Sequence, residues 1–261
     1  MNKYCVVAKK DLKSSEIKKK IIEKLNNIME YNEEKPELVI TVGGDGTILR
    51  AVQNYINQLE TVHFVGIHTG TLGFYTDYKA EELDGFLNDI ITDQYNITKT
   101  RLVEAEYNNN GESKIYFGLN EVRIESVHST LVCDIKIDNE FLETFRGNGI
   151  CVSSSSGSTA YNRSIGGSVI APNIPVLQLS EIAGIHHNAY RSLQSSLILA
   201  GSQVVNIDLI VANRPILGVD QLTIEIDNIK HLKVRLSNKF VKFVNYKPLS
   251  FIDRIRKAFI N

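Results

Sequence analysis

Residues 37–51 read ELVITVGGDGTILRA, and this stretch decides the fold class that the sequence predicts. Leu38–Val42 is an apolar, β-branched run, short enough for a strand buried in a sheet. From Leu49 to Leu59, apolar residues recur at helical spacing. The stretch therefore predicts a strand, a tight loop and a helix, and the loop lies at the carboxyl end of the strand, where open α/β sheets bind their ligands.

The loop Gly43–Thr47 has the composition of a phosphate-binding turn. Gly43, Gly44 and Gly46 lack Cβ atoms, so this backbone can take positive φ and turn its N–H groups toward an anion. Asp45 would repel a phosphate unless it orients a hydroxyl, meets a metal ion or removes a proton, and Thr47 is expected to cap the next helix. An ordinary strand-to-helix turn accounts for a bare G-G-x-G equally well, and the standard motifs GxxxxGK[ST] and GxGxxG are absent here.

Composition places the chain among soluble globular proteins. Its 261 residues, 43% of them hydrophobic, suffice for one large domain or two modest ones. No run approaches the roughly 18 apolar residues of a membrane span, and the formal net charge of −1 predicts neither a nucleic-acid nor a membrane partner. Cys5, Cys133 and Cys151 are odd in number and far apart, which signals no disulfide framework and no zinc site. We therefore expect a cytoplasmic protein whose chain provides no metal site of its own.

Two further segments extend the α/β pattern on either side of the glycine loop. Tyr4–Ala8 predicts a first strand, and Ser14 or Ser15 is expected to cap the helix that follows it. Val62–Ile67 predicts a third strand. Strand, helix and strand in succession are the opening of a parallel α/β unit.

A second glycine-rich turn, HTGTLGFYTD at residues 68–77, follows the third strand. Phe74 in this turn either offers aromatic surface beside a cleft or packs into the core, and both interpretations fit. The next helix is expected to be capped near Thr76 or Asp77.

From about residue 97 the pattern changes to that of strands. Residues 108–111 end in the Asn-Gly pair of a hairpin. Cys133, Ile135 and Ile137 alternate with polar residues, as in a half-buried strand, and similar segments continue to about residue 246. The sequence thus predicts an α/β domain over residues 1–96, a β-rich domain over 97–249, and a helix over 250–261 that packs back on the first domain.

A second stretch, FRGNGICVSSSSGSTAYNRSIGGSVIAP at residues 145–172, concentrates glycines and hydroxyls as a ligand-binding loop does. Hydroxyls can read sugar hydroxyls or base edges, Gly157 permits close approach, and Tyr161 can lie flat against a planar ring. A serine hydrolase is disfavoured because G-x-S-x-G is absent. A flexible linker is disfavoured because apolar residues flank the serines closely.

Three motifs of this chain, in order, resemble those of the bacterial NAD kinases. GGDGT at residues 43–47 resembles a signature that these enzymes share with the diacylglycerol and sphingosine lipid kinases, and phosphofructokinases carry a similar loop. Asn120-Glu121 resembles the family's Asn-Glu pair, and GSTAYNRSIGG at residues 157–167 resembles its G-[ST]-T-A-Y-N-x-S-x-G-G segment, which the lipid kinases do not share. The resemblance implies an α/β amino-terminal domain and an all-β, β-sandwich-like carboxyl-terminal domain that enclose a nucleotide site.

The resemblance also implies an activity. A phosphoryl group would pass from ATP or polyphosphate, with a divalent cation such as Mg, to the 2′-hydroxyl of the adenosine ribose of NAD, in a homodimer or homotetramer. Asp45 would be the catalytic carboxylate, and Gly43, Gly44, Gly46 and Thr47 would form the phosphate loop. The substrate-binding positions carried over by motif are Asp45, Gly46, Phe74, Asn120, Glu121, Arg146, Asn148, Ser156, Thr159, Ala160, Tyr161, Asn162, Arg163, Ser164, Ala183 and Gln221.

The chain departs from the family pattern at three places. Asn148 stands where the family has Asp in R-G-D-G, Ser154-Ser155 replace Thr-Pro, and Gln221 follows Asp220 where a small residue or His is common. Asn148 keeps an acceptor but loses a charge, so a dinucleotide sensor without activity is one alternative. A lipid kinase is a second alternative, which the missing basic or amphipathic membrane face disfavours.

Overall fold

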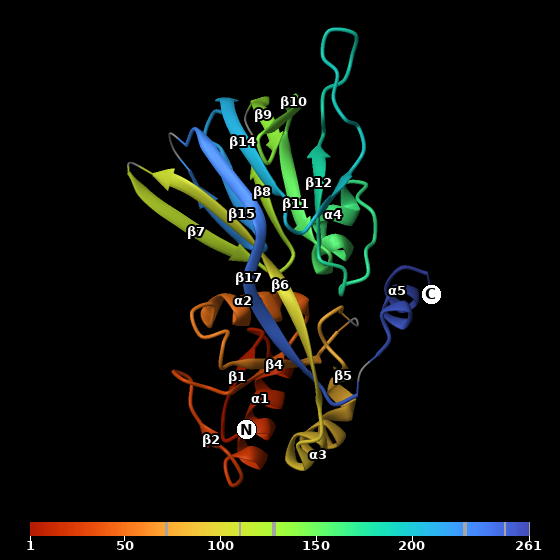
Figure 1. The fold of residues 1–261 in the computed structure, drawn as a ribbon. Helices are drawn as coiled ribbons and strands as arrows, with labels where there is room; N and C mark the ends of the chain where they lie inside the picture. The colour runs from red at the N-terminus through yellow and green to blue at the C-terminus, as the bar shows by residue number, and fades with distance from the viewer. Residues whose placement is uncertain (71–72, 110, 127–128, 227–228, 248, 261) are drawn as a thin grey trace. The chain divides into compact units, whose positions relative to one another are not determined.

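Figure 1 shows the computed structural model, which describes residues 1–70, 73–109, 111–126, 129–226, 229–247 and 249–260. The chain divides into two compact units, one of residues 1–100 and 240–261 and one of residues 101–239. Two long strands, β6 (Asn96–Asn109) and β17 (His231–Asn245), contribute residues to both units. The two units are described in turn.

The first unit alternates strands and helices. Its elements are β1 (Lys3–Ala8), α1 (Leu12–Leu25), β2 (Glu30–Tyr31), β3 (Leu38–Val42), α2 (Asp45–Asn54), β4 (His63–His68), β5 (Tyr78–Lys79), the 3₁₀ turn η1 (Ala80–Glu82), α3 (Leu83–Thr92) and α5 (Phe251–Phe259). Strands β2, β1, β3, β4 and β5 pair in this order, and every pair is parallel. The end of β17 also pairs parallel with β4, through Phe243 and Phe64.

Strand β3 forms the centre of this sheet because its side chains are apolar on both faces. All five of its residues are buried. Leu38, Ile40 and Val42 share a core with apolar residues of α1 and α3, whereas Thr41, on the opposite face, lies beside Gly66 together with Ile48 of α2. Helices thus cover both faces of a parallel sheet, as continuous apolar strands require. The predicted α/β domain class is confirmed.

Two predicted helix caps are wrong. Helix α1 begins behind Asp11, whose carboxylate accepts a hydrogen bond from the Ser14 N–H at 2.8 Å, so neither Ser14 nor Ser15 caps it. Aspartate is as good an N-cap as serine, and it lies one turn earlier. Helix α3 begins at Leu83 behind η1, so Thr76 and Asp77 lie too early in the chain to cap it.

Helix α2 also differs from its predicted form. Its N-cap is Gly44, which places Thr47 inside the first turn rather than at the cap. It ends at Asn54, so Ile56 and Leu59 continue the apolar spacing beyond the helix.

The second unit is built of strands in two sheets. Its elements are β7 (Glu112–Gly118), β8 (Glu121–Glu125), β9 (Leu131–Ile137), β10 (Glu140–Gly147), β11 (Gly149–Ser154), the 3₁₀ turn η2 (Ser156–Thr159), the single-turn helix α4 (Tyr161–Ser164), β12 (Val176–Ile182), β13 (Leu197–Ala200), β14 (Val204–Val211), β15 (Ile216–Val219) and β16 (Leu222–Glu225). One sheet has the order β13-β12-β11-β8-β15-β16, and the other includes β10-β9-β14-β17 with β6 and β7. Buried residues of both sheets form a single core, so the predicted β-sandwich-like class is confirmed.

The predicted strand patterns of this unit are observed with one difference. Asn109 pairs with Glu112, and Gly111 takes a φ of +89°, which fits the predicted hairpin, although Asn110 lies outside the described residues. Cys133 and Ile135 are buried, and the polar residues between and after them are half-buried. The segments HLKVRL and KFVKFVNY, which look separate in the sequence, form one strand, β17.

Among the described residues, no helix has both the length and the apolar character that a membrane crossing requires. Cys5, Cys133 and Cys151 are free and buried, in agreement with the absence of a disulfide framework.

Candidate active site

The glycine loop lies at the carboxyl end of β3, between that strand and α2 (Figure 1). Gly43 has a φ of +155°, and a Cβ there would lie 2.2 Å from Thr47 Oγ1, so this position requires glycine. Gly44 has an ordinary φ of −101°. A Cβ on Gly44 or Gly46 would meet nothing within 4 Å, so these two glycines leave open space at the N-terminus of α2.

Asp45, the first residue of α2, is held by the second glycine-rich turn. Its Oδ2 accepts a hydrogen bond from the Phe74 N–H at 2.8 Å, and its Oδ1 accepts one from the Tyr75 N–H at 3.2 Å. A Cβ on Gly73 would lie 2.1 Å from Asp45 Oδ1. The turn therefore packs closely around the carboxylate. Residues 71–72 of the turn lie outside the described residues.

Phe74 serves this arrangement through its backbone more than through its ring. The ring packs against Phe259 of α5, with 5.5 Å between the centroids. Tyr75, the next residue, stacks on Phe243 of β17 at 5.4 Å. Both rings are half-buried and pack on other aromatic rings of the unit.

The surroundings of Asp45 make its carboxyl a better base than an exposed one. Burial raises the pKa of Asp45. The N–H groups of Phe74 and Tyr75 and the charges of Arg254 and His68 lower it and so partly offset the effect of burial. A carboxylate with a raised pKa holds a transferred proton more firmly. Asp45 thus combines a fixed orientation with increased basicity.

A basic pocket of about 680 Å³ lies beside the glycine loop. Three cationic side chains line it, Lys9 at the end of β1, Lys13 in α1 and Arg50 in α2. Its other lining residues are Asp11, Gly44, Gly46, Thr47, Thr69 and Gly70. Three cations beside the N-terminus of a ten-residue helix make a pocket that suits a polyanion such as a chain of phosphates.

In the second unit, Asn120 lies in the turn between β7 and β8, and Glu121 is the first residue of β8. Both are buried, and the Asp220 carboxylate holds their backbone from the facing β15–β16 turn. It accepts hydrogen bonds from the N–H groups of Leu119, Asn120 and Glu121 at 2.7, 2.8 and 3.3 Å. Asp220 itself has a φ of +50°, a conformation that aspartate tolerates better than most residues. Three consecutive amides on one carboxylate fix the shape of the turn.

The Glu121 side chain has an unusual environment. Burial above all, and then the charge of Asp220, raises the pKa of Glu121 to about 8, while Arg123 opposes this shift. Its Oε2 is buried and has no hydrogen-bond partner among the described residues. A buried oxygen of this kind is available to a hydroxyl or amine of a ligand or to a water molecule.

The serine-rich segment packs against the Asn120–Glu121 turn. Ser154 Oγ donates to Leu119 O at 2.8 Å, and Ser156 Oγ donates to the same carbonyl at 3.2 Å. A Cβ on Gly157 would lie 1.9 Å from Asn120 O, so this glycine permits the contact. Two serine hydroxyls of the segment thus support this turn, whereas Ser155 and Ser158 donate to the carbonyl groups of Ile174 and Ile170.

The GSTAYN segment divides into buried and accessible residues. Asn162 is fully buried, and its Oδ1 accepts a hydrogen bond from Ser180 Oγ at 2.8 Å. The Arg123 guanidinium lies 4.5 Å from the centroid of the Tyr161 ring and covers one of its faces. Of the substrate-binding positions predicted in this segment, those that keep accessible surface are Thr159, Ala160, Tyr161, Arg163 and Ser164.

Three further predicted residues lie at the other end of the sheet that contains β11 and β12: Arg146, Asn148 and Ala183. Asn148 N–H donates to Ile182 O at 3.0 Å, and a Cβ on Gly147 would lie 2.7 Å from Ala183 O. Asn148 is exposed, and the Arg146 guanidinium lies 4.3 Å from the centroid of the Tyr190 ring. The sequence reasoning listed Arg146, Asn148 and Ala183 as substrate-binding positions but missed Tyr190.

Strand β11 connects the two groups of predicted residues. Ser153, near its end, pairs with Glu121, and Gly149, at its start, lies next to Asn148. Five residue steps at about 3.4 Å each separate Gly149 from Ser154, roughly 17 Å. A ligand that contacts both groups must therefore be long, as a dinucleotide is. Gln221 is exposed beside Asp220, in the group around Asn120.

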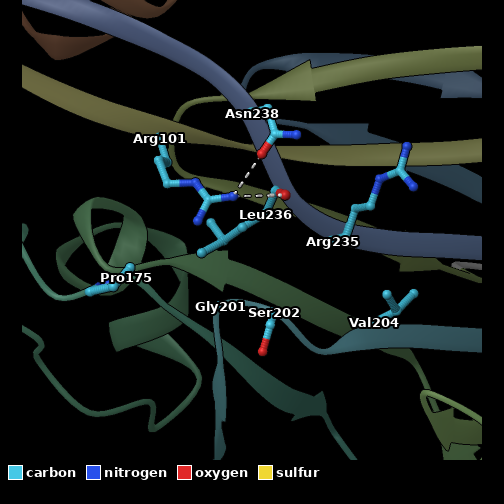
Figure 2. Close-up of a pocket in the computed structure, with 8 residues that line it drawn as sticks. All are labelled: Arg101, Pro175, Gly201, Ser202, Val204, Arg235, Leu236 and Asn238. Atoms are coloured by element: carbon cyan, nitrogen blue, oxygen red, sulfur yellow. Dashed lines mark hydrogen bonds between the residues drawn. The ribbon is translucent and has the colours of Figure 1, made fainter.

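Figure 2 shows a pocket in the second unit, of about 440 Å³, which is lined by none of the predicted residues. Arg101 donates to Ser237 O at 2.9 Å and Leu236 O at 3.3 Å, and Arg235 forms an ion pair with Glu104. Its two arginines thus bind protein groups, and their role here is structural.

Besides Tyr190, sequence reasoning missed four basic residues and noted Asp220 only as a region. Lys9 follows β1, and Lys13, Arg50 and Arg254 lie in α1, α2 and α5. Lys9 could have been found, because it follows a strand and ligands bind at the carboxyl ends of parallel strands. Lys13, Arg50 and Arg254 reach the glycine loop or the second glycine-rich turn only in the folded unit.

Comparison with known families and proteins places the chain consistently. The family model described as the ATP-NAD kinase N-terminal domain matches residues 5–95, and the one described as the ATP-NAD kinase C-terminal domain matches residues 119–246. An NAD kinase of Staphylococcus epidermidis is 36% identical over 99% of this chain and 98% of its own length. One from Staphylococcus aureus is 35% identical over the same shares.

Solved structures share the fold at lower identity. A yeast NADH kinase complexed with NADH matches with a TM-score of 0.87 at 20% identity, over 100% of this chain and 88% of its own. An NAD kinase from Archaeoglobus fulgidus in complex with ATP matches with a TM-score of 0.76 at 20% identity, over 99% of this chain and 96% of its own.

Proposed function

This chain belongs to the ATP-NAD kinase family and phosphorylates NAD, and we propose that Asp45 is the carboxylate on which the transfer depends. The acceptor is the 2′-hydroxyl of the adenosine ribose, and the product is NADP. The observation that supports the role of Asp45 is its position: a buried carboxylate, fixed by two backbone N–H groups, at the N-terminus of the helix beside the basic pocket.

Phosphoryl transfer needs positioning and charge stabilisation more than covalent help from the protein, because its transition state is loose. In our proposal Asp45 orients the ribose hydroxyl toward the phosphorus and accepts its proton as the new bond forms. The amides of Phe74 and Tyr75 keep the carboxylate in one orientation, and burial makes it more basic. Both effects favour a late proton transfer.

The basic pocket is the proposed place of the donor phosphates. Lys9, Lys13 and Arg50 offset the negative charge of the donor, and the open space at Gly44 and Gly46 lets phosphate oxygens approach the N–H groups of α2. Solved relatives in complex with NADH and with ATP support the two substrate classes. ATP and polyphosphate present the same chemistry to this pocket.

NAD is the proposed ligand of the second unit. Asn120 can both donate to and accept from an adenine edge, and Glu121 can bind a ribose diol through its buried oxygen. Tyr161 and its accessible neighbours Thr159, Ala160, Arg163 and Ser164 would line the adenosine pocket. Arg146, Asn148 and Ala183 would contact the nicotinamide end, and Asn148 would do so by neutral hydrogen bonds.

A divalent cation, most simply Mg²⁺, is proposed to arrive with the donor. The described residues hold no group of three His, Cys, Asp or Glu side chains that forms a metal site. Mg²⁺ commonly binds substrate phosphates, water and one or two carboxylates. When bound, the ion neutralises charge that develops on the phosphates.

The proposed setting of the enzyme is the cytoplasm, as a homodimer or homotetramer. Three free, buried cysteines fit a reducing compartment. Self-association is supported by the family to which the chain belongs.

The test is the production of NADP from NAD and ATP by the purified chain and by Asp45→Asn. A positioned general base contributes roughly 10² to 10⁴ in rate, so turnover should fall by that factor while the dissociation constant for NAD changes little. Asp84→Asn, at an exposed position of α3, is the matched control and should keep parental turnover. Parental turnover in Asp45→Asn would refute the role. Failure of the unaltered chain to form NADP would instead favour a dinucleotide sensor.

A further inference from the structure

Arg254, in the last helix of the chain, is buried against the turn that holds Asp45. Its side chain is 11% exposed, and that of Asp77, with which it forms an ion pair, is 6% exposed. Its Nη1 also donates to Gly73 O at 3.1 Å and to Thr76 O at 2.6 Å. One guanidinium therefore ties together three residues spread over five positions of the turn.

The acceptors of Arg254 flank the donors to Asp45 in the chain. Gly73 and Thr76 present their carbonyl groups to Arg254, and Phe74 and Tyr75, between them, present their N–H groups to the Asp45 carboxylate. The backbone of residues 73–77 is thus fixed from both sides. If the carbonyl groups were released, the two N–H groups would lose their common direction.

We propose that Arg254 is a positioning residue for Asp45: its guanidinium fixes residues 73–77 in the shape that aims two backbone N–H groups at the carboxylate. The inference rests on the proposed function, because it takes Asp45 as the catalytic group. Arg254 acts through the turn, at a distance of 209 residues along the chain from Asp45.

Helix α5 places the side chain of Arg254 on this turn. None of its residues is fully buried, and Ile252 is 71% exposed. Its aromatic contact, Phe259 on Phe74, also ends on the same turn. A helix that served mainly to close the core would bury its apolar face, so the contacts of α5 point to the turn as its purpose.

The charge of Arg254 adds a second effect on Asp45. Arg254 and His68 are the charged or titratable groups that favour the ionised carboxyl and so lower its pKa, against the increase that burial causes. Asp77, which also faces Arg254, is its ion-pair partner. Removal of the guanidinium should therefore raise the pKa of Asp45 and move the acidic side of the pH profile to higher pH.

The experiment compares Arg254→Gln with Arg254→Lys and with Arg256→Gln, in kcat, KM for NAD and the pH dependence of kcat. Arg256 is the matched control, because it lies on the same helix, is 56% exposed and pairs only locally with Asp253. A small misplacement of a reacting group can cost about 10²-fold, so kcat of Arg254→Gln should fall roughly 10- to 10²-fold with KM for NAD within about twofold. The acidic limb of the pH profile of kcat for Arg254→Gln should shift to higher pH.

Arg254→Lys separates geometry from charge. Lysine keeps the cation but not the planar fork that reaches three acceptors, so kcat should fall by less and the acidic limb should stay near that of the parent. Arg256→Gln should match the parent in every quantity. A merely structural role for Arg254 would lower the melting temperature without moving the pH profile.

Loss of Arg254 alone leaves Asp77 buried without its partner, which can unfold the unit. The double variant Asp77→Asn with Arg254→Gln removes both charges and is the second variant to measure, with its fold checked by circular dichroism. It should show the same loss of kcat and a smaller shift, because loss of the Asp77 charge opposes the effect of loss of the guanidinium. Parental kcat and an unshifted limb in a folded variant, while Asp45→Asn is inactive, would overturn the inference alone. Full activity of Asp45→Asn would overturn the proposed role of Asp45 first.

Discussion

Gly73 and the Asp45 carboxylate touch: a methyl group on Gly73 would lie 2.1 Å from Asp45 Oδ1. A side chain at residue 73 would collide with this carboxylate, so the requirement for glycine comes from the carboxylate itself. The second glycine-rich turn is therefore shaped around the proposed catalytic group. This contact joins two motifs that are separate in the sequence.

Gly73→Ala should displace the Asp45 carboxylate and lower kcat by roughly 10- to 10²-fold, since misplacement of a reacting group by about 1 Å has an effect of that size. Gly85→Ala is the control, because a Cβ at that exposed position of α3 meets nothing within 4 Å. Steady-state kinetics of NADP formation measures both. Equal kcat in the two variants would contradict the close contact.

Lys13→Gln and Arg50→Gln should each raise KM for ATP about tenfold or more, because a hydrogen bond to a charged group contributes about 1.5–3 kcal/mol. The KM for NAD should change little, since the residues proposed to bind it lie elsewhere in the chain. Lys10→Gln removes an exposed charge outside the pocket and serves as the control. An increase in KM for NAD alone would show that the pocket binds the acceptor.

Asp220→Asn should raise KM for NAD and lower the stability of the protein by about 1.5–3 kcal/mol, because a charged acceptor of three N–H groups is replaced by a neutral amide. Glu225→Gln, at an exposed position of the same hairpin, should have no effect on either quantity. Chemical denaturation and the dependence of rate on NAD concentration measure the two effects. An unchanged KM would mean that the Asn120–Glu121 turn keeps its shape without Asp220.

Glu121 should make the stability of the protein depend on pH. Its pKa is raised on folding from 4.5 to about 8, chiefly by burial and then by Asp220, so the folded state favours the protonated form. Protonated Glu121 contributes to the free energy of unfolding. This contribution is fully present below pH 4.5 and is lost as the pH rises toward 8. In Glu121→Gln this loss should vanish, because glutamine does not titrate.

Melting temperatures of Glu121→Gln and of the parent, measured from pH 4.5 to 9, provide the test. The variant should gain on the parent as the pH rises and keep a constant advantage above about pH 8. Glu125→Gln, on the same strand, is a control without this gain. Parallel melting curves for Glu121→Gln and the parent would contradict a buried, protonated Glu121.

The amino-acid sequence by itself determined the two fold classes and the family. Leu38–Val42 predicts a buried parallel strand because it is apolar on both faces, and Cys133 and Ile135 predict a half-buried strand because they alternate with polar residues; such periodicities follow from local geometry. GGDGT, Asn120-Glu121 and GSTAYN likewise are local strings. The helix caps were harder, because Asp11 and Ser14 are both good caps and only the backbone decides between them.

The tertiary structure alone decided what surrounds these motifs. Lys9, Lys13 and Arg50 come from different elements and form one pocket only when the parallel sheet is assembled. Asp220 reaches the Asn120–Glu121 turn, and Arg254 reaches the turn that holds Asp45, across about 100 and 180 residues of chain respectively. Contacts between residues so far apart leave no period in the sequence, because they depend on how whole elements pack and not on the rise or twist of any one of them.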